Sequence, residues 1–192
     1  MVSILAGVIC GCGGQQKTDE KMVYNKEFDW MMIIPEGFDS MTTEEVRTIQ
    51  GKGLEAMEKT YGREIEDKGG TIFAFKSGQT ALFHGNWQPF DSSLGSYGEG
   101  YRALNRMIYA TFETQMTGAR LDSSSSIETI SGLQFLVFKV RVGLGDTVLD
   151  CWYYRRLFGK KELLVNITTA DKEKQKALLE AWRKSKFGSD DR

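Results

Sequence analysis

The sequence has few of the residues on which metal centres, disulfide scaffolds and proline-rich stalks depend. Its 192 residues include one histidine, three cysteines and two prolines. A single histidine excludes a histidine-rich metal centre, and three cysteines are too few for a dense disulfide framework. We therefore expect no metal site and no cofactor.

The chain also has almost no net charge. The 25 basic and 26 acidic residues give a formal charge of −1, so the chain lacks the basic footprint of a nucleic-acid-binding protein. Hydrophobic residues make up 41% of the chain and aromatic residues 11%, which argues against disorder. We expect one folded domain that binds no nucleic acid.

The apolar run at the amino terminus, residues 2–9, is too short to span a membrane, because a spanning helix needs about 20 apolar residues. It is an apolar tail, a buried first element or a processing signal. Secretory signals combine an apolar segment of about 7 to 15 residues with small residues at the cleavage point. A basic residue usually precedes that segment, and none does here.

The segment Ile9-Cys10-Gly11-Cys12 resembles the bacterial lipobox, in which an aliphatic and then a small residue precede a cysteine that becomes diacylated. The resemblance implies that Cys12 carries the lipid, since Gly11 is small and Ile9 is aliphatic. Cys10 is the alternative, although bulky Ile9 would then stand at the cleavage point. A Cys-x-Cys metal pair is disfavoured, because no further Cys or His stands nearby to complete the site.

These features predict four segments: a lipoprotein signal at residues 1–11, a flexible tether at 12–27, a folded domain at 28–187 and a disordered tail at 188–192. On this interpretation the protein is extracytoplasmic and lipid-anchored to the cell membrane.

Hydrophobic periodicity and turn residues predict an α+β fold with a mainly antiparallel sheet. Thr42 and Glu45 form a capping-box pattern at the start of a helix, and Gly118 is placed to end a second one. Residues 123–126 are expected to form a polar linker. The expected strands are 28–34, 71–76, 80–84, 136–142, 147–158 and 162–168, and the expected helices are 42–61, 97–116 and one around 172–184.

The order of these elements resembles the PsbP-like α/β/α sandwich, a superfamily that includes photosystem II PsbP, a Ran-binding import factor and bacterial lipoproteins. The resemblance is based on residues 34–38 (IPEGF), 130–132 (ISG), 163–169 (LLVNITT) and 185–187 (SKF). It implies this fold, and no functional residue of the named relatives has a counterpart here. Together with Cys12, the element order favours a cell-envelope lipoprotein with a non-catalytic binding or accessory domain.

Candidate catalytic residues are few, and no catalytic residue is assigned. His84 would have to serve any His-dependent hydrolase, but a structural histidine at the end of a strand is favoured, and there is no Gly-x-Ser-x-Gly motif. Cys151 is expected to be a free thiol in a strand. Asp146 and Asp150 are the carboxylates that a small hydrolase or transferase would use, and this enzyme is the main alternative function.

Two further patterns suggest binding. The glycine-rich segment 95–100 precedes a helix, but Glu99 would repel phosphate and no Lys-Ser/Thr follows. Trp152, Tyr154 and Arg156 share one face of a strand, so they form a binding patch if that face is exposed, or a core row if it is not. The expected partners are the membrane, through the lipid, and an envelope protein. A cytoplasmic protein-interaction adaptor is a third possibility.

Overall fold

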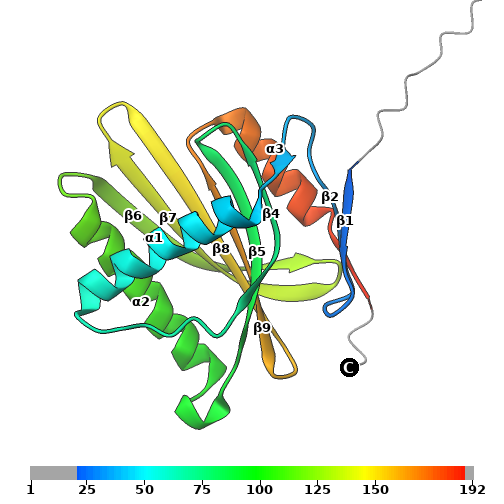
Figure 1. Ribbon diagram of the computed structural model, residues 1–192, viewed down its shortest axis with the longest axis horizontal. Coiled ribbons are helices and arrows are strands. Elements are labelled where there is room, and N and C mark those ends of the chain that lie inside the picture. Colours follow the sequence, from blue (N-terminus) through cyan, green and yellow to red (C-terminus); the bar gives the residue numbers. More distant parts are fainter. Residues whose placement is uncertain (1–20, 189–192) are drawn as a thin grey trace, which may run out of the picture.

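The computed structural model describes residues 21–188, in which three helices pack against an antiparallel sheet (Figure 1). The expected signal, Cys10, Cys12, residues 12–20 of the tether and residues 189–192 of the tail lie outside the described residues. The helices are α1 Thr43–Tyr61, α2 Tyr97–Gln115 and α3 Lys172–Arg183, with a 3-10 turn at Ser92–Leu94. The strands are β1 Met22–Asn25, β2 Trp30–Ile33, β3 Asp39–Ser40, β4 Gly70–Ser77, β5 Ala81–Pro89, β6 Arg120–Ile130, β7 Leu133–Leu144, β8 Thr147–Phe158, β9 Lys161–Thr169 and β10 Lys186–Phe187.

The main sheet has seven strands in the order β3-β4-β5-β9-β8-β7-β6, and every neighbouring pair is antiparallel. Helices α1 and α2 cover one face and α3 covers the other (Figure 1). A second sheet, β1-β2-β10, lies at one edge of the molecule (Figure 1). This confirms the expected α+β sandwich. Within residues 21–188, no helix is both long and apolar enough to cross a membrane.

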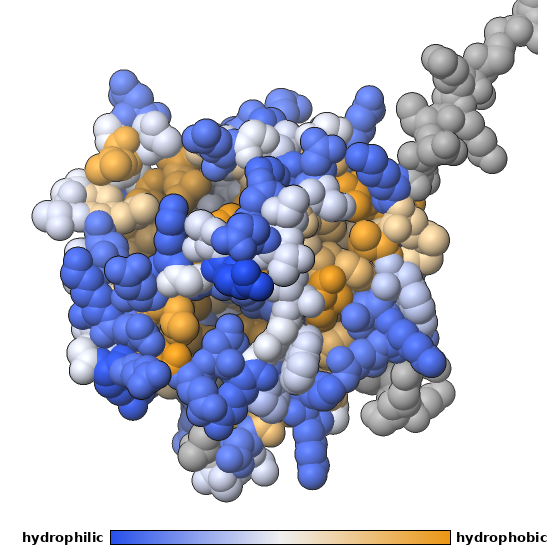
Figure 2. All heavy atoms as spheres, viewed as in Figure 1, coloured by the Kyte–Doolittle hydropathy of each residue, from blue (hydrophilic) through white to orange (hydrophobic). Residues whose placement is uncertain are grey.

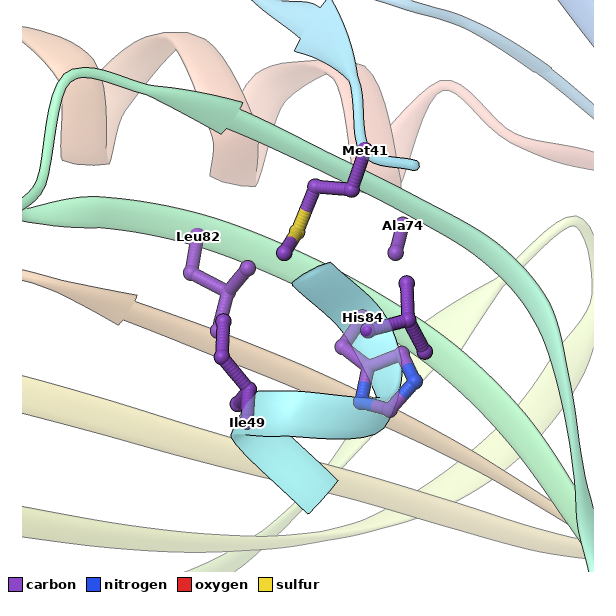
Figure 3. A pocket seen from close by; sticks show the side chains of 6 residues that line it. Met41, Ile49, Ala74, Leu82 and His84 are labelled. Carbon is purple, nitrogen blue, oxygen red and sulfur yellow. The ribbon is translucent and has the colours of Figure 1, made fainter. Parts of the chain in front are cut away.

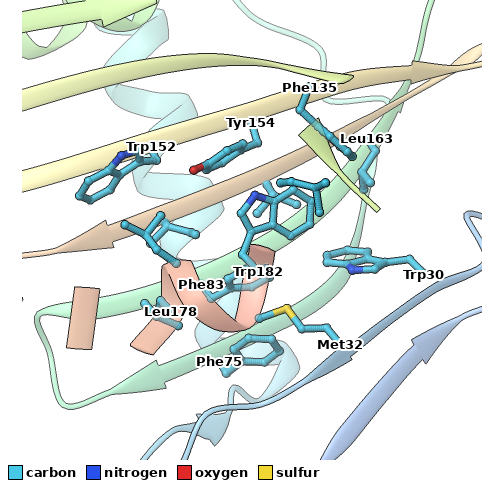
Figure 4. Packing of buried hydrophobic residues seen from close by; sticks show 14 of the residues in the cluster. Trp30, Met32, Phe75, Phe83, Phe135, Trp152, Tyr154, Leu163, Leu178 and Trp182 are labelled. Carbon is cyan, nitrogen blue, oxygen red and sulfur yellow. The ribbon is translucent and has the colours of Figure 1, made fainter. Parts of the chain in front are cut away.

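The face covered by α3 holds an aromatic core (Figure 4). The Trp182 ring of α3 lies 5.2 Å from that of Phe135, 5.3 Å from that of Tyr154 and 5.6 Å from that of Trp30, and all four residues are buried. Alternate residues of each strand point to one face, so the period of two seen in the sequence delivers these side chains together. Large buried aromatics of this kind dominate core energetics.

The face covered by α1 and α2 is more polar. Helix α1 has no buried residue, and α2 buries only Tyr101 and Asn105. The strand residues that face these helices include His84 and Gln88 of β5, beside a smaller apolar cluster around Val140. Tyr101 is thus the one hydrophobic side chain that α1 and α2 bury fully, whereas α3 buries three.

Helix starts follow local side-chain chemistry. The Thr42 hydroxyl accepts from the Glu45 backbone amide, and the Glu45 carboxylate accepts from that of Thr42, as the sequence predicted. Ser96 and Glu99 do the same for α2. Glu99 thus occupies the anion position at this helix start, so segment 95–100 is no phosphate loop.

Two predictions about irregular segments are wrong. The tether does not extend to residue 27, because β1 pairs with β2 from Met22 onward, and Lys21 already accepts a backbone hydrogen bond from Ile34. The expected linker at residues 123–126 is the middle of β6, which pairs residue for residue with β7. Its serines are exposed on an edge strand, where no apolar alternation marks the strand in the sequence.

Candidate binding site

A buried ion pair lies between the sheet and α2. Arg155 of β8 donates to the Glu162 carboxylate of β9 at 2.7 Å, and each side chain is about 4% exposed. Gln88 of β5 donates to the same carboxylate oxygen at 2.5 Å. Burial of a charged pair is unfavourable unless further hydrogen bonds satisfy the remaining donors and acceptors.

Helix α2 closes over this pair with residues spaced four apart. Tyr97, Tyr101 and Asn105 share one side of the helix, as the helical period requires. The Arg155 guanidinium carbon lies 6.0 Å from the centre of the Tyr101 ring, within cation–π range. Burial, together with the nearby Glu162 charge, raises the pKa of Tyr97 well above its usual range, so its hydroxyl stays protonated. We call these three residues of α2, together with Gln88, Arg155 and Glu162, the polar cluster.

Several polar atoms of the polar cluster have no hydrogen-bond partner among the described residues. They include Arg155 Nε and Nη1, Tyr101 Oη and Asn105 Oδ1, all fully buried. Buried polar groups in proteins normally have a partner, which is protein, water or ligand. Among these residues, Asn105 also lines a groove beside α2.

A shallow groove of about 240 Å³ adjoins the polar cluster at Asn105. Tyr109 and Glu113 continue the wall along α2, and Ser123 of β6 and Phe138 of β7 form the opposite wall. Ligand pockets are typically about 300 to 1,000 Å³, so this groove fits a small group or one side chain of a partner. The remaining lining residues are Arg106 and Ala110.

Sequence reasoning missed the polar cluster, although one signal was present. Arg155 and Glu162 lie on either side of the short connection between the strands expected at 147–158 and 162–168. The hairpin pairs Arg155 with Leu164 and Leu157 with Glu162, so the two charges are diagonal neighbours on one face. The contribution of α2 could not be found in this way, because helix packing on a sheet is not encoded in local spacing.

The expected patch of Trp152, Tyr154 and Arg156 is not a surface (Figure 4). Trp152 and Tyr154 are 6% and 0% exposed and belong to the aromatic core, because α3 covers this face of β8. The core-row alternative is correct for these two residues. Arg156 lies at the rim, where it donates to the Gln134 carbonyl at 3.0 Å. The neighbouring Arg155 points to the other face of β8 and is buried there.

His84 is a structural residue of β5 rather than a strand end. Its ring lies among Met41, Ile49 and Leu82, in a recess too small to admit a water molecule (Figure 3). Its Nε2 atom is 3.1 Å from the Thr71 hydroxyl, and burial lowers its pKa, which favours the neutral ring.

The carboxylates of the alternative enzyme do not converge. Asp150 is 1% exposed and accepts from Arg141 at 2.8 Å, Lys172 at 2.7 Å and Gln175 at 2.8 Å. Burial alone would raise its pKa, but these hydrogen bonds outweigh burial and hold it well below the usual range. Asp146 is exposed in the β7–β8 turn. Asp150 is therefore a structural anchor for α3.

Cys151 is a buried free thiol, and burial raises its pKa to about 11. A thiol of this kind is almost wholly protonated at neutral pH and is a poor nucleophile. Among residues 21–188, no three Asp, Glu, His or Cys side chains are grouped so that they could hold a metal ion.

Comparisons with known proteins support the fold. No family model matches the sequence, and no curated protein matches it. The solution structure of cyanobacterial PsbP (CyanoP) from Synechocystis sp. PCC 6803 has a TM-score of 0.56 at 10% identity and covers 93% of this chain and 98% of that chain. The crystal structure of the Ran-binding protein Mog1p from Saccharomyces cerevisiae has a TM-score of 0.43 at 11% identity and covers 88% of this chain and 95% of that chain. The chain thus shares the α+β fold of cyanobacterial PsbP.

Proposed function

We propose that this protein is a cell-envelope lipoprotein whose α+β domain is a non-catalytic binding or accessory module. The observation that carries the first half is the lipobox-like segment ending at Cys12, ten positions before β1 begins at Met22. Residues 13–21 reach at most roughly 30 Å when fully extended. An acyl group on Cys12 would thus keep the domain close to the membrane.

The polar cluster and its groove support the second half. They combine buried polar atoms in need of partners with an opening beside Asn105, and small-molecule sites pair apolar walls with a few such groups. Two groups that an enzyme would use for catalysis have structural roles or the wrong protonation state. Asp150 binds α3 through Lys172, and Cys151 is protonated. A binding module fits this arrangement better than a hydrolase or transferase does.

Metabolic labelling with a palmitate analogue tests the anchor. Cells that produce the full-length wild type should label it, and Cys12→Ala should abolish the label while the matched variant Cys10→Ala keeps it. Loss of the label in Cys10→Ala alone would move the lipid to Cys10. No label in any of the three proteins would contradict the lipoprotein proposal and favour a cytoplasmic adaptor.

Site-specific photocrosslinking tests the groove. A photoreactive amino acid at position 109 should capture a molecule from intact envelopes, because Tyr109 lines the groove. The same probe at position 148, at the start of β8 and outside the residues that line the groove, is the control. Absence of an adduct at 109, or the same adduct at both positions, would contradict a binding role for the groove.

A further inference from the structure

We propose that the outer face of the β1-β2-β10 sheet is a membrane-contacting surface that seats the domain on a lipid bilayer. The inference rests on the proposed function for its context, since a lipid on Cys12 would bring the bilayer to this sheet. The occupant is the lipid surface itself rather than a protein.

Strand register places four hydrophobic side chains on this outer face. Met22 is opposite Ile33, and Tyr24 is opposite Met31. Directly opposed residues of an antiparallel pair point to the same side of the sheet. The alternate residues point inward: Trp30 and Met32 are buried in the aromatic core, and Val23 packs against it.

These outward side chains are unusually exposed. Met22 is 60% exposed, Tyr24 is 55% exposed and Ile33 is 46% exposed. They are three of the eight strongly exposed large hydrophobic residues in the described part of the chain. Figure 2 shows hydrophobic surface on the side of the domain where the amino-terminal chain enters. Contiguous exposed apolar groups of this kind mark interaction sites.

The residues that border this face favour a bilayer as the partner. Lys186 of β10 pairs with Met31 and therefore lies on the same face. Lysine can extend its ammonium group to lipid headgroups while its aliphatic stem stays on apolar surface, and tyrosine suits the same interface. Lys186 adds only one positive charge to this face, so apolar contact and not net charge must supply most of the affinity.

The position along the chain supplies the remaining argument. Met22 follows Cys12 by ten residues, so no other described strand or helix lies as close in sequence to the proposed anchor. The exposed residues Leu144 and Val148 lie on the β7–β8 hairpin, at the opposite side of the molecule from β1 (Figure 1). They provide a control surface with similar side chains.

Fluorescence quenching in vesicles tests the proposal on the lipidated full-length protein. In a Cys10→Ser background, an environment-sensitive fluorophore is attached to Tyr24→Cys or, as the control, to Val148→Cys. Cys151 is buried and protonated, so it should not label. In vesicles of phosphatidylethanolamine and phosphatidylglycerol that contain nitroxide lipids, we expect at least threefold stronger quenching at position 24. Equal quenching, or none at position 24, would overturn the proposal and leave the anchor standing.

Vesicle flotation of the unlipidated full chain separates this inference from the anchor. In a Cys12→Ala background, Met22→Ser with Ile33→Ser should reduce the bound fraction at least threefold, whereas Leu144→Ser with Val148→Ser should not. Unchanged binding would overturn the proposal, even if palmitate labelling succeeds. If Met22→Ser with Ile33→Ser reduces binding, Leu144→Ser with Val148→Ser does not, and palmitate labelling fails, this proposal stands without the lipid anchor. The fluorophore at position 24 is also examined in the protein without lipid. If it is already shielded from water there, the outer face is covered by residues 2–9 or by a second copy of the chain, and the proposal is overturned.

Discussion

At the scale of single residues, Asp150 shows how a buried charge can hold two elements together. Its carboxylate lies in β8 and binds Lys172 and Gln175 of α3 as well as Arg141 of β7. The substitution Asp150→Asn removes the negative charge that Arg141 and Lys172 bind. Removing one partner of a buried pair costs about 3 to 5 kcal/mol, and the exposure of Lys172 and Arg141 reduces this to about 2 kcal/mol. Urea unfolding at pH 7 measures the loss.

The pH dependence of the same variant follows from the lowered pKa. A carboxyl group with a depressed folded-state pKa contributes stability above its unfolded pKa, about 3.9, and loses that contribution as pH falls toward the folded value. The gap in unfolding free energy between wild type and Asp150→Asn should therefore narrow below about pH 4. Asp146→Asn, in the exposed turn, should change stability by less than about 0.5 kcal/mol at either pH. A constant gap would show that Asp150 is not charged in the fold.

Cys151 gives a second prediction at this scale. With Cys10 and Cys12 replaced by Ser, it is the sole thiol of the chain. Because burial raises its pKa to about 11, its reaction with a disulfide reagent at pH 8 should be at least about 100-fold slower in the folded protein than in urea. Rapid reaction in the folded protein would indicate an accessible thiolate and reopen the nucleophile hypothesis.

At the scale of elements, Gly85 limits how closely β5 and β2 can pack. A Cβ atom at this position would lie 2.7 and 2.8 Å from two ring carbons of Trp30, which is itself fully buried. Gly85→Ala should therefore lower the unfolding free energy by about 1 to 3 kcal/mol, as overpacking of a core does.

Gly100 is the matched control for this substitution. It lies inside α2, where an added Cβ would meet nothing within 4 Å. Gly100→Ala should raise the unfolding free energy by about 0.5 to 1 kcal/mol through helix propensity. Denaturant unfolding of both variants checks the pair. A stability gain for Gly85→Ala would mean that Trp30 can move away at little cost.

Elements with a strong local signal could be predicted, and those defined by pairing alone could not. The capping box at Thr42, the helical spacing of α2 and the alternation in β7 and β8 are local, and the structure confirms them. Strands β1 and β6 lack such signals. Residues 22–25 follow a polar segment, and β6 carries four consecutive serines. Both are strands because a neighbour offers backbone partners, which is a long-range cause.

The residues of the candidate site also fall into those that the sequence could predict and those that it could not. A free thiol at Cys151 and a structural role for His84 followed from their places in apolar strands, whereas the full burial of Cys151 did not. The polar cluster could not be predicted, because it needs the register of β8 against β9 and the packing of α2 over Arg155. The burial of Trp152 likewise depends on which face α3 covers. The sequence therefore determined which residues share a face, and tertiary packing decided which face meets solvent.

At the scale of the whole molecule, the sheet has two unlike faces. Helix α3 buries Leu178, Leu179 and Trp182 in the aromatic core, whereas α1 buries none of its 19 residues. Helix α2 sits on the polar cluster and a smaller apolar group. Since apolar burial is the main stabilising term, the α1 side should open at lower free energy than the α3 side. The groove beside α2 then lies on the more mobile half of the domain.

Hydrogen exchange measures this difference directly. Backbone amides that open locally exchange at a lower free energy than those that need global unfolding. Peptides from α1, residues 43–61, should exchange at least about tenfold faster than peptides from α3, residues 172–183, after correction for intrinsic rates. Gly51 and Gly53 inside α1 add to the difference, because each costs about 1 kcal/mol relative to Ala in a helix. The variant Gly51→Ala with Gly53→Ala should therefore slow exchange in α1 and leave α3 unchanged. If α1 and α3 exchange at the same rate in the wild type, the two faces unfold as one cooperative unit, and the polar face contributes more stability than its burial indicates.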